Sequence, residues 1–555
     1  MGTQVKGRLG DRLIERGLCS QRDVDVALSE QRRAWRPLGE ILVSLGFLKH
    51  EDIARVIAED LGLAFVRARD VEPEAALKSA IDREFVRSTG AFPLALTDGV
   101  LRVAMVQPDD PEKVALVRAQ FPYPLELAVI TERDLGELVR THLVDERLEV
   151  AQIFRELEKP KDGEWPVERL VAAILMDGVR RGATDIHIEP EERLTRVRYR
   201  VDGLLMQGEN LPREASDAVV SHIKVLANLD IAERRRPQDG RLRATVDKRQ
   251  VSMRLSIMPT ADGENIVLRI LDRSAGMLAM NDLGISRRHQ VLLRKIAQRD
   301  HGLFLVTGPT GSGKTTTLYS LLAEIDASVR NVATIEDPIE YRLPLLRQSQ
   351  VDPSIGFGFK EGLRALLRQD PDVILVGEIR DQETADMAIK ASMTGHLVFS
   401  TLHTNSALGA IPRLTDLGID PYLVEDSLIG VLAQRLVRRV CTACGEVCAP
   451  NERELRFLGE DRGAPQRGKG CRRCRDSGYS GRLAICELFL PDEPMADVLR
   501  GGANLGELHR LAMASGYQTI NDDGRAKIRS GETTLDEVER VNKSHRLSAE
   551  ERDNV

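Results

Sequence analysis

Residues 301–315 read HGLFLVTGPTGSGKT, and this stretch decides the fold of the region around it. The apolar run predicts a buried strand, the last eight letters satisfy the pattern G-x-x-x-x-G-K-[ST], and leucines at helical spacing follow. Gly308, Gly311 and Gly313 allow a tight loop whose N–H groups point at phosphate oxygens, beside the positive end of a helix. The stretch therefore predicts a strand, a phosphate-binding P-loop and a helix.

The loop and the first turn of its helix are expected to bind ATP. Lys314 should reach the β- and γ-phosphates, and the hydroxyl of Thr315 should ligate Mg²⁺. The chain lacks the NKxD pattern that usually reads guanine, which favours ATP over GTP. The expected ATP-binding residues are Gly308, Pro309, Thr310, Gly311, Ser312, Gly313, Lys314, Thr315 and Thr316.

Acidic residues follow two of the apolar strands that come next. Glu336, Asp337 and Glu340 lie in ATIEDPIE, and Glu378 follows DVILVG. Strands that alternate with helices predict a parallel sheet with helices on both faces, and the carboxyl ends of such strands face the nucleotide. Phosphoryl hydrolysis needs carboxylates that hold Mg²⁺ or orient water. Each acid also has an ordinary alternative, a helix cap or a surface ion pair.

Two histidines flank the next strand, in TGHLVFSTLHTN. His396 lies near its start and His403 near its end. Two roles stay open for them: a hydrogen-bonded structural histidine at a strand end, or a sensor of the γ-phosphate.

The chain has seven cysteines, of which four form two close pairs. Cys-x-x-Cys twice over suits tetrahedral Zn²⁺, and four thiolates leave no open position, so the metal should be structural. Cys448 is near enough to compete with the first pair, while Cys19 and Cys486 have apolar neighbours and are expected to be small buried residues. The expected zinc ligands are Cys441, Cys444, Cys471 and Cys474.

Composition bounds the class of protein. The 555 residues are 42% hydrophobic and 30% charged, with a net charge of −7 and only 4% aromatic side chains. No apolar run approaches the ~18 residues of a membrane span, and the N-terminus lacks the apolar core of a signal peptide. These features exclude collagen-like, disordered, disulfide-rich secreted and transmembrane classes, and they predict a multidomain cytosolic protein without nucleic-acid partners.

An internal repeat opens the chain. Residues 8–31 and 37–60 share one pattern, in which Gly10 matches Gly39, and two helical hairpins that bury one another are expected. Two α/β segments separated by a charged linker follow, then the P-loop region, the cysteines and a helical tail. The expected domains are a helical repeat at 1–64, a small α/β domain at 65–150, a linker at 151–164, a second α/β domain at 165–285, an ATPase domain at 286–440, a zinc module at 441–486 and a helical region at 487–555.

Motif order extends these local patterns to a family. GPTGSGKT, TIEDPIEY, LRQDPDVILVGEIRD, TGHLVFSTLHTNSA and GVLAQRLVRRVCTAC, preceded by ATDIHIEP, VRYRVDG and RRPQDGR, resemble the successive motifs of the type II secretion and type IV pilus assembly ATPases. The resemblance spans about residues 160 to 545. It implies a homohexameric ring whose subunits pair a PAS-like domain at 165–285 with a RecA-like P-loop ATPase core, in an α/β multidomain fold.

The resemblance also implies roles for single residues. Glu378 would orient or deprotonate water, with Glu336 or Glu340 contributing to metal or water binding. His396 and His403 fall in the family's histidine motif. Arginines of the PAS-like domain would stabilise transition-state charge, and by motif these are Arg198 in VRYR and, on a looser match, Arg213 in LPRE.

The N-terminal repeat resembles the domain that binds cyclic di-GMP in some of these ATPases. That pattern begins each copy with Arg and ends it with Gln. The first copy has Arg8 and Gln31, whereas the second has Pro37 and Asp60, and an Asp would repel a phosphate. Docking onto a membrane-anchored partner is the rival role.

Three functions are open at this point. The preferred one is a cytoplasmic motor that hydrolyses Mg-ATP, docks at the inner membrane through protein partners, and drives pseudopilus assembly in type II secretion through a platform protein. The closer branch is judged from EDPIEY, GVLAQRLVR and the cysteines. The alternatives are a type IV or MSHA-type pilus assembly ATPase regulated by cyclic di-GMP, and a DNA-uptake motor, which the negative net charge disfavours.

Overall fold

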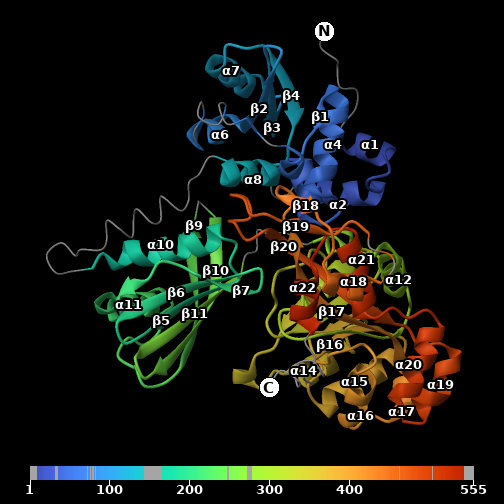
Figure 1. The fold of residues 1–555 in the computed structure, drawn as a ribbon. Helices are drawn as coiled ribbons and strands as arrows, with labels where there is room; N and C mark the ends of the chain where they lie inside the picture. Colours follow the sequence, from blue (N-terminus) through green and yellow to red (C-terminus); the bar gives the residue numbers. More distant parts are fainter. Residues whose placement is uncertain are drawn as a thin grey trace. The chain divides into compact units, whose positions relative to one another are not determined.

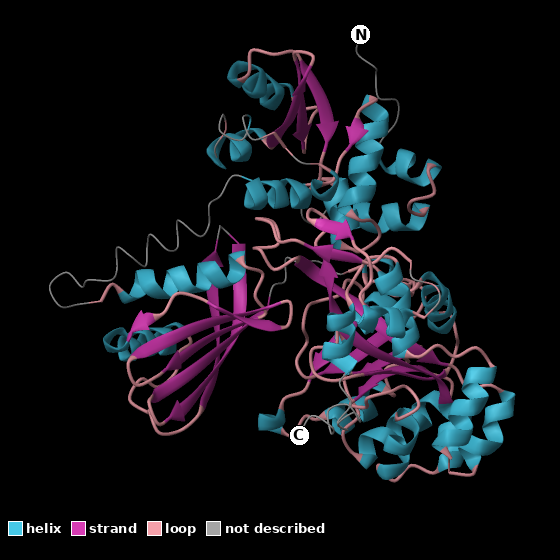
Figure 2. Ribbon diagram, viewed as in Figure 1, coloured by secondary structure: helices cyan, strands magenta, loops and turns pink. Residues whose placement is uncertain are grey.

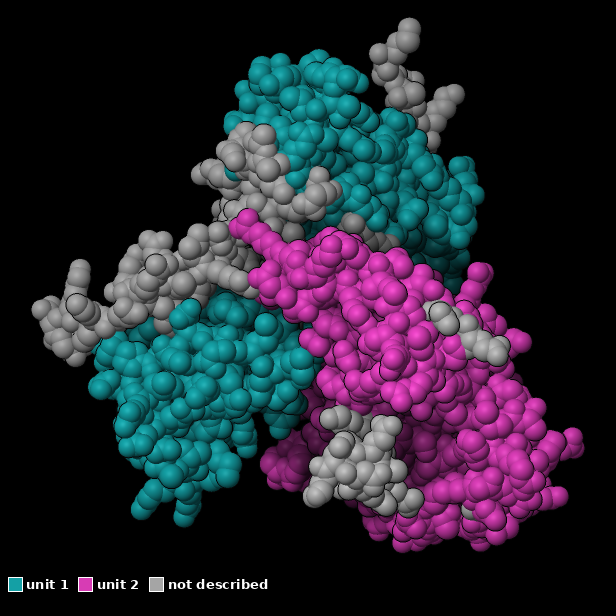
Figure 3. Space-filling model, viewed as in Figure 1, with its two compact units in different colours: residues 1–270 teal, residues 271–555 magenta. Residues whose placement is uncertain are grey.

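The computed structural model divides the chain into two compact units, residues 1–270 and 271–555 (Figure 3). Each unit is described by itself. The structure describes residues 9–542 apart from 32–35, 72, 75, 76, 78–80, 82, 143–164, 247, 248, 272–277, 460, 462 and 503. The expected linker at 151–164 and Arg8 therefore lie outside the described residues.

The internal repeat forms two helical hairpins. Gly10 and Gly39 have matching reasons to be glycine, because a Cβ would lie 2.9 Å from Val24 in the first copy and 3.1 Å from Ile53 in the second. The two hairpins bury Leu13, Ala27, Ile41, Leu42, Leu48 and Val56 in one core. The helices are α1 (Leu9–Glu15), α2 (Gln21–Gln31), α3 (Leu38–Ser44) and α4 (His50–Leu61).

A four-stranded sheet follows, in the order β1-β4-β3-β2. Its apolar side chains, among them Phe92, Leu101 and Met105, form a separate core under the helices. The strands are β1 (Ala64–Phe65), β2 (Ala91–Thr97), β3 (Val100–Met105) and β4 (Leu125–Val129), and the helices are α6 (Arg83–Thr89), α7 (Pro111–Gln120) and α8 (Glu132–His142).

The remainder of unit 1 is an antiparallel sheet in the order β7-β6-β5-β11-β10-β9, with β8 (Leu211–Pro212) paired to β6. Period-two alternation along β6 buries Val197 and Tyr199 with helices α10 and α11, and leaves Arg196, Arg198 and Arg200 on the other face. The elements are α10 (Val167–Arg180), α11 (Ser216–Leu226), β5 (Asp185–Pro190), β6 (Leu194–Val201), β7 (Leu204–Gln207), β9 (Gln238–Val246), β10 (Arg249–Thr260) and β11 (Gly263–Leu271).

Unit 2 is built on a seven-stranded sheet in the order β14-β13-β15-β16-β12-β17-β20 (Figures 1 and 2). All pairs are parallel except β17 with β20. Both faces of β12 are buried: Leu303 and Leu305 join one core, and Phe304 and Val306 join the other. The strands are β12 (Gly302–Thr307), β13 (Val332–Glu336), β14 (Arg347–Gln350), β15 (Val373–Val376), β16 (Leu397–Leu402), β17 (Leu428–Val440) and β20 (Tyr479–Phe489).

Helices cover both faces of this sheet, as the alternation of strands and helices predicts. Residues Met280, Leu283 and Ile285 pack into the core beside the helix that follows the P-loop, so this packing starts before the expected boundary at 286. The helices are α12 (Arg287–Ala297), α13 (Lys314–Leu322), α14 (Phe359–Leu366), α15 (Gln382–Met393), α16 (Ala410–Asp416) and α17 (Pro421–Ser427).

The cysteine segment interrupts the sheet between β17 and its neighbour β20. The expected boundary at 440 therefore cuts through one sheet, because β20 pairs with β17 from Val431 to Val440 across the insertion. The insertion holds β18 (Gly445–Val447), α18 (Glu452–Leu458) and β19 (Gln466–Gly468). The last helices are α19 (Glu493–Arg500), α20 (Leu505–Ala514), α21 (Ile520–Arg529) and α22 (Leu535–Asn542).

Among the described residues, none of the helices has both the length and the apolar character needed to cross a membrane.

Candidate phosphate-binding site and metal centre

The P-loop connects β12 to α13 at the carboxyl edge of the parallel sheet. Gly308, Gly311 and Gly313 all have positive φ, at 148°, 79° and 86°, a region that side chains disfavour. Gly313 is the N-cap of α13, so a phosphate bound in the loop would lie at the N-terminus of this helix. The local sequence thus folds as the pattern predicts.

Lys314 lies across the loop that precedes it. Its Nζ donates to the carbonyl of Gly308 at 2.8 Å and to that of Pro309 at 3.1 Å. The pKa of Lys314 is lowered overall. Burial and the positive charge of Arg435 lower it, and together they outweigh the carboxylate of Glu378, which raises it. An anion that entered the loop would offer this ammonium group a stronger partner than two carbonyls.

Glu378 lies beside Lys314, just after β15. Its carboxylate is 12% exposed, and its two oxygens lie 2.5 Å from Arg380 Nη2 and 3.8 Å from His403 Nε2. Burial lowers the pKa of His403, and Lys314 lowers it further. An acid, a histidine with a lowered pKa and a lysine are therefore gathered next to the P-loop.

The structure does not bring His396 to this group. Leu397, the residue after it, pairs with Gly302 at the start of β12, whereas Leu402 pairs with Thr307 at the end. The six residues of β16 separate the two histidines by roughly 20 Å. His396 Nδ1 instead contacts the carbonyl oxygen of Ala391 at 2.9 Å. The direction of the strand therefore places His403 at the edge of the sheet where the P-loop lies, and His396 at the opposite edge.

Glu336 is buried inside the sheet rather than presented to solvent. It is 3% exposed and accepts hydrogen bonds from Tyr319 Oη, Thr334 Oγ1 and Gln348 Nε2. Burial, together with Glu336, raises the pKa of Tyr319 well above its usual value. This carboxylate links α13 to β13 and β14. Glu340, by contrast, is exposed.

Arg198 and Arg213, the two expected arginines, belong to unit 1, and each is hydrogen-bonded to an acceptor within that unit. Arg198 makes a bidentate pair with Glu189, at 2.8 and 2.7 Å, across the β5–β6 ladder. Arg213 donates from Nη2 to the carbonyl of Asp262 at 2.7 Å.

Sequence reasoning missed several residues that shape the site. Thr307 Oγ1 lies 2.7 Å from Thr404 Oγ1 and accepts from the Thr404 amide at 2.8 Å, which ties the loop after β16 to the end of β12. Arg435 is buried and donates to the carbonyl of Asn405 at 2.7 Å. Gln434 contacts the P-loop itself. The motif GVLAQRLVR contains two of these residues, but nothing local to it indicates their partners.

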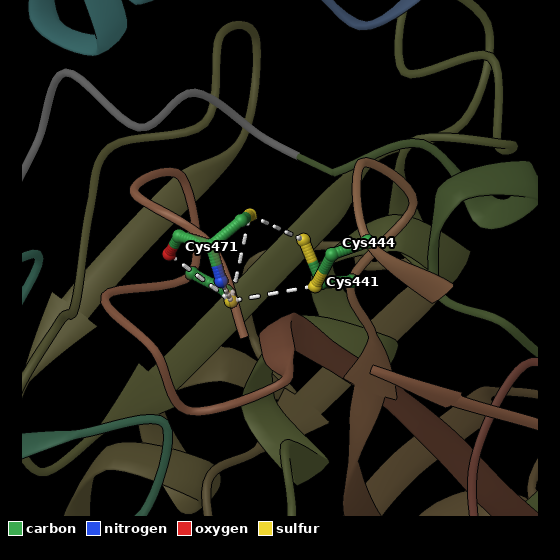
Figure 4. Close-up of side chains that lie close together, drawn as sticks. Cys441, Cys444 and Cys471 are labelled. Carbon is green, nitrogen blue, oxygen red and sulfur yellow. Dashed lines mark hydrogen bonds between the residues drawn. The ribbon is translucent and has the colours of Figure 1, made fainter. Parts of the chain in front are cut away.

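The four paired cysteines converge at one point (Figure 4). Sulfur–sulfur distances are 3.8 Å for Cys441–Cys471 and 3.7 Å for both Cys444–Cys474 and Cys471–Cys474. A tetrahedron with Zn–S bonds of ~2.3 Å has edges of about 3.8 Å, so the donor set fits zinc without rearrangement. The amide of Cys441 donates to Gly478 at 2.9 Å and that of Lys469 to Cys444 at 3.1 Å, so backbone bonds join the two pairs.

The other cysteines stay apart from this cluster. Cys448 Sγ lies 3.6 Å from the carbonyl oxygen of Pro465, so it does not compete with the first pair. Cys486 is buried in β20, 3.5 Å from His289 Nδ1, and its burial raises the pKa of the thiol. Cys19 is half-buried.

At the end of the second repeat, Asp60 is not free to repel a ligand. It forms ion pairs with Arg12 and, at 2.8 Å, with Arg16, both from the first copy. Its counterpart Gln31 donates to the carbonyl of Arg36 at 2.6 Å.

Two known protein families match successive parts of the chain. A family described as "Type II/IV secretion system protein" matches residues 160–540, and the MshEN domain matches 61–148, which is the small α/β domain rather than the repeat. Type II secretion system protein E of Pseudomonas aeruginosa is 47% identical over 76% of this chain and 84% of its own length. The type IV pilus assembly ATPase PilB of Myxococcus xanthus is 36% identical over 96% of this chain and 98% of its own.

One solved structure supports the fold alone. The X-ray structure of the Legionella pneumophila ATPase DotB is 21% identical, with a TM-score of 0.51, and the match covers 69% of this chain and 98% of that one. The fold of about two thirds of this chain therefore resembles that of a protein with only 21% sequence identity.

The positions of the two histidines generate a prediction. His403→Ala should lower the ratio of ATP to ADP affinity by about tenfold, because a charge-assisted contact to the γ-phosphate is lost. His396→Ala should leave the ratio within about twofold, since His396 lies at the other end of β16. Competition with a fluorescent nucleotide, using a non-hydrolysable ATP analogue and ADP, measures both; equal effects of the two substitutions would contradict the placement.

Proposed function

The chain belongs to the type II/IV secretion system protein family, and on that premise we propose that it is a motor ATPase of protein secretion that hydrolyses Mg-ATP at its P-loop. The observation that carries the proposal is the gathering of Lys314, Glu378 and His403 at a P-loop that faces a helix N-terminus. Each of these groups has a task in phosphoryl transfer.

Binding is the task of the loop and of Lys314. The backbone N–H groups of the loop, which Pro309 lacks, would bind the β-phosphate, and Lys314 would exchange the carbonyls of Gly308 and Pro309 for phosphate oxygens. The half-buried hydroxyl of Thr315, in the first turn of α13, is placed to hold Mg²⁺. Mg²⁺ supplies neutralisation of the phosphate charge when bound.

Glu378 is the group proposed to accept the proton of the attacking water. Its side chain is only slightly exposed, and the ion pair with Arg380 fixes the orientation of the carboxylate. Its contact with His403 at 3.8 Å supports a role for His403 in sensing the γ-phosphate. Glu340, exposed after β13, remains a candidate for metal or water binding, whereas Glu336 is proposed to hold α13 against the sheet.

Arg198 and Arg213 are retained as candidates for stabilising transition-state charge. To act so, Arg198 would exchange the carboxylate of Glu189 for a phosphate, and Arg213 would leave the carbonyl of Asp262. Both exchanges replace one acceptor by a more strongly charged one.

The catalytic assignment predicts a clear ranking of variants. Lys314→Ala should abolish nucleotide binding and turnover, whereas Glu378→Gln should keep ADP affinity within about threefold and lower kcat at least 100-fold, because only proton acceptance is removed. Glu383→Gln, an exposed acid at the start of α15, is the matched control and should behave as wild type. Phosphate release with and without Mg²⁺ measures turnover, and full activity of both Lys314→Ala and Glu378→Gln would refute the proposal.

Type II secretion is the preferred pathway, with pilus assembly as the second candidate. Identity to one type II secretion system protein E reaches 47% over 76% of this chain, whereas over 92–96% of the chain another such protein and a PilB are equally similar, at 38% and 39%. The match to PilB of Myxococcus xanthus covers 96% of this chain, and this coverage supports pilus assembly as the second candidate. We place the protein in the cytoplasm as a homohexamer that reaches the inner membrane through a platform protein and a membrane-anchored docking protein, with no nucleic-acid partner.

We further propose that the four clustered cysteines bind one structural Zn²⁺. The sulfur distances support this, as does the position of the cluster. The centre closes the insertion between β17 and β20, and at its base the amide of Val440 donates to Glu532, near the C-terminal helices, at 2.9 Å.

Zinc content tests this assignment. Purified chain should contain one zinc per molecule by elemental analysis, and Cys471→Ser should lose it and unfold at a lower temperature, because three thiolates bind more weakly than four. Cys448→Ser is the matched control and should keep its zinc, since Cys448 contacts Pro465 instead. Full zinc in Cys471→Ser would contradict the assignment.

The N-terminal repeat is proposed to sense cyclic di-GMP, with docking onto the membrane-anchored partner as its rival role. The ion pairs of Asp60 with Arg12 and Arg16 predict that the repeat binds cyclic di-GMP only weakly. These guanidinium groups already have a carboxylate partner and are less available to the phosphates of the ligand.

Calorimetry of the full chain with cyclic di-GMP tests this role. Asp60→Asn should bind about tenfold more tightly than wild type, because two arginines are released to the phosphates and a negative charge is removed. Asp25→Asn, on the exposed face of α2, should match wild type. No heat from either wild type or Asp60→Asn would leave docking as the role of the repeat.

A further inference from the structure

Gln434 lies against the P-loop although it is distant from it in sequence. Thr307, the last residue of β12, pairs with Ala433 of β17. The next residue of β17 is therefore beside the point where the chain leaves β12 to form the loop. The side chain of Gln434 is 2% exposed, so it is fully enclosed by this contact.

Both ends of the Gln434 amide are hydrogen-bonded to the loop and its helix. Its Nε2 donates to the carbonyl of Ser312 at 2.7 Å, and its Oε1 accepts from Thr317 Oγ1 at 2.8 Å. One side chain thus supplies a donor to the residue before the N-cap and an acceptor to the second turn of α13. Glutamine offers this pair of groups without having to be protonated, unlike glutamate.

Two motif glycines pack directly on Gln434. A Cβ on Gly308 would lie 2.5 Å from the main-chain carbonyl oxygen of Gln434. A Cβ on Gly313 would lie 2.8 Å from the side-chain Nε2 of Gln434. These glycines are required for this close approach as well as for their positive φ. Gln434 therefore fills the side of the loop that faces the sheet.

We propose that Gln434 is a positioning residue for ATP, which holds the P-loop in the shape that binds phosphate. The carbonyl of Ser312 and the N–H of Gly313 belong to one planar trans peptide and point in opposite directions. The bond from Gln434 to that carbonyl directs the Gly313 N–H away from the sheet and leaves it to the phosphate. This inference rests on the proposed function, since it concerns the same site.

The role has a kinetic signature. Gln434 acts through the loop on the bound phosphates, which are held in the ground state and in the transition state alike. Loss of such uniform binding raises KM and leaves kcat unchanged. A merely structural role would instead lower activity in proportion to the folded fraction and leave KM as it is.

Gln434→Met tests the proposal, because methionine keeps the length of the side chain and removes both hydrogen bonds. KM for ATP and the calorimetric Kd for ADP should rise about tenfold, with kcat within about twofold of wild type. Gln290→Met is the matched control: Gln290 Nε2 donates to the carbonyl of Ile285 at 2.7 Å in the same unit, and its loss should move neither constant.

The outcomes separate cleanly. Unchanged KM and Kd in folded Gln434→Met would overturn the proposal. If that variant does not fold, Thr317→Val removes one of the same bonds from the other side and should raise Kd about threefold; an unchanged Kd there would equally overturn it. The ADP measurement does not depend on hydrolysis, so a wild-type chain that binds ADP without turning over ATP would contradict the proposed function and leave this test valid.

Discussion

The parallel pairing of β12 with β16 on one side and β17 on the other is the constraint on which the site depends. It places Thr307 beside Leu402 and beside Ala433, so β12 and β16 end side by side against the middle of β17, which continues to Val440. The P-loop, the loop that begins with His403, and Gln434 must then meet, and β15 delivers Glu378 to the same edge. Side-chain bonds such as Thr307–Thr404 refine an arrangement that backbone pairing has already determined.

Local patterns could be predicted from the sequence, and long-range partners could not. The P-loop and the cysteine pairs are encoded by spacing within a few residues, and Glu378 follows from its place after a buried strand. The burial of Glu336 depends on Tyr319 and Gln348, whose side chains reach it from other elements. The difference between His396 and His403 follows from strand direction, since only the carboxyl end of a parallel strand faces the phosphate.

The cysteine module is inserted between two paired strands of the ATPase sheet. The last strand of that sheet, β20, therefore comes after the module, beyond the nucleotide-binding motifs. Antiparallel neighbours are usually joined by a short turn, but here β17 and β20 are separated by the whole module. The converging sulfurs close that long connection in place of a turn. The cysteine cluster lies just beyond the end of β17, the strand from which Gln434 contacts the P-loop.

A crystal structure with Mg²⁺ and a non-hydrolysable ATP analogue tests the central claim most directly, that this sheet edge is a preformed ATP site. Lys314 Nζ should leave the carbonyls of Gly308 and Pro309 and lie within about 3 Å of the β- and γ-phosphate oxygens. The bonds of Gln434 to Ser312 and Thr317 should be unchanged. A nucleotide bound elsewhere, or a Lys314 that keeps its bonds to the two carbonyls, would contradict the account.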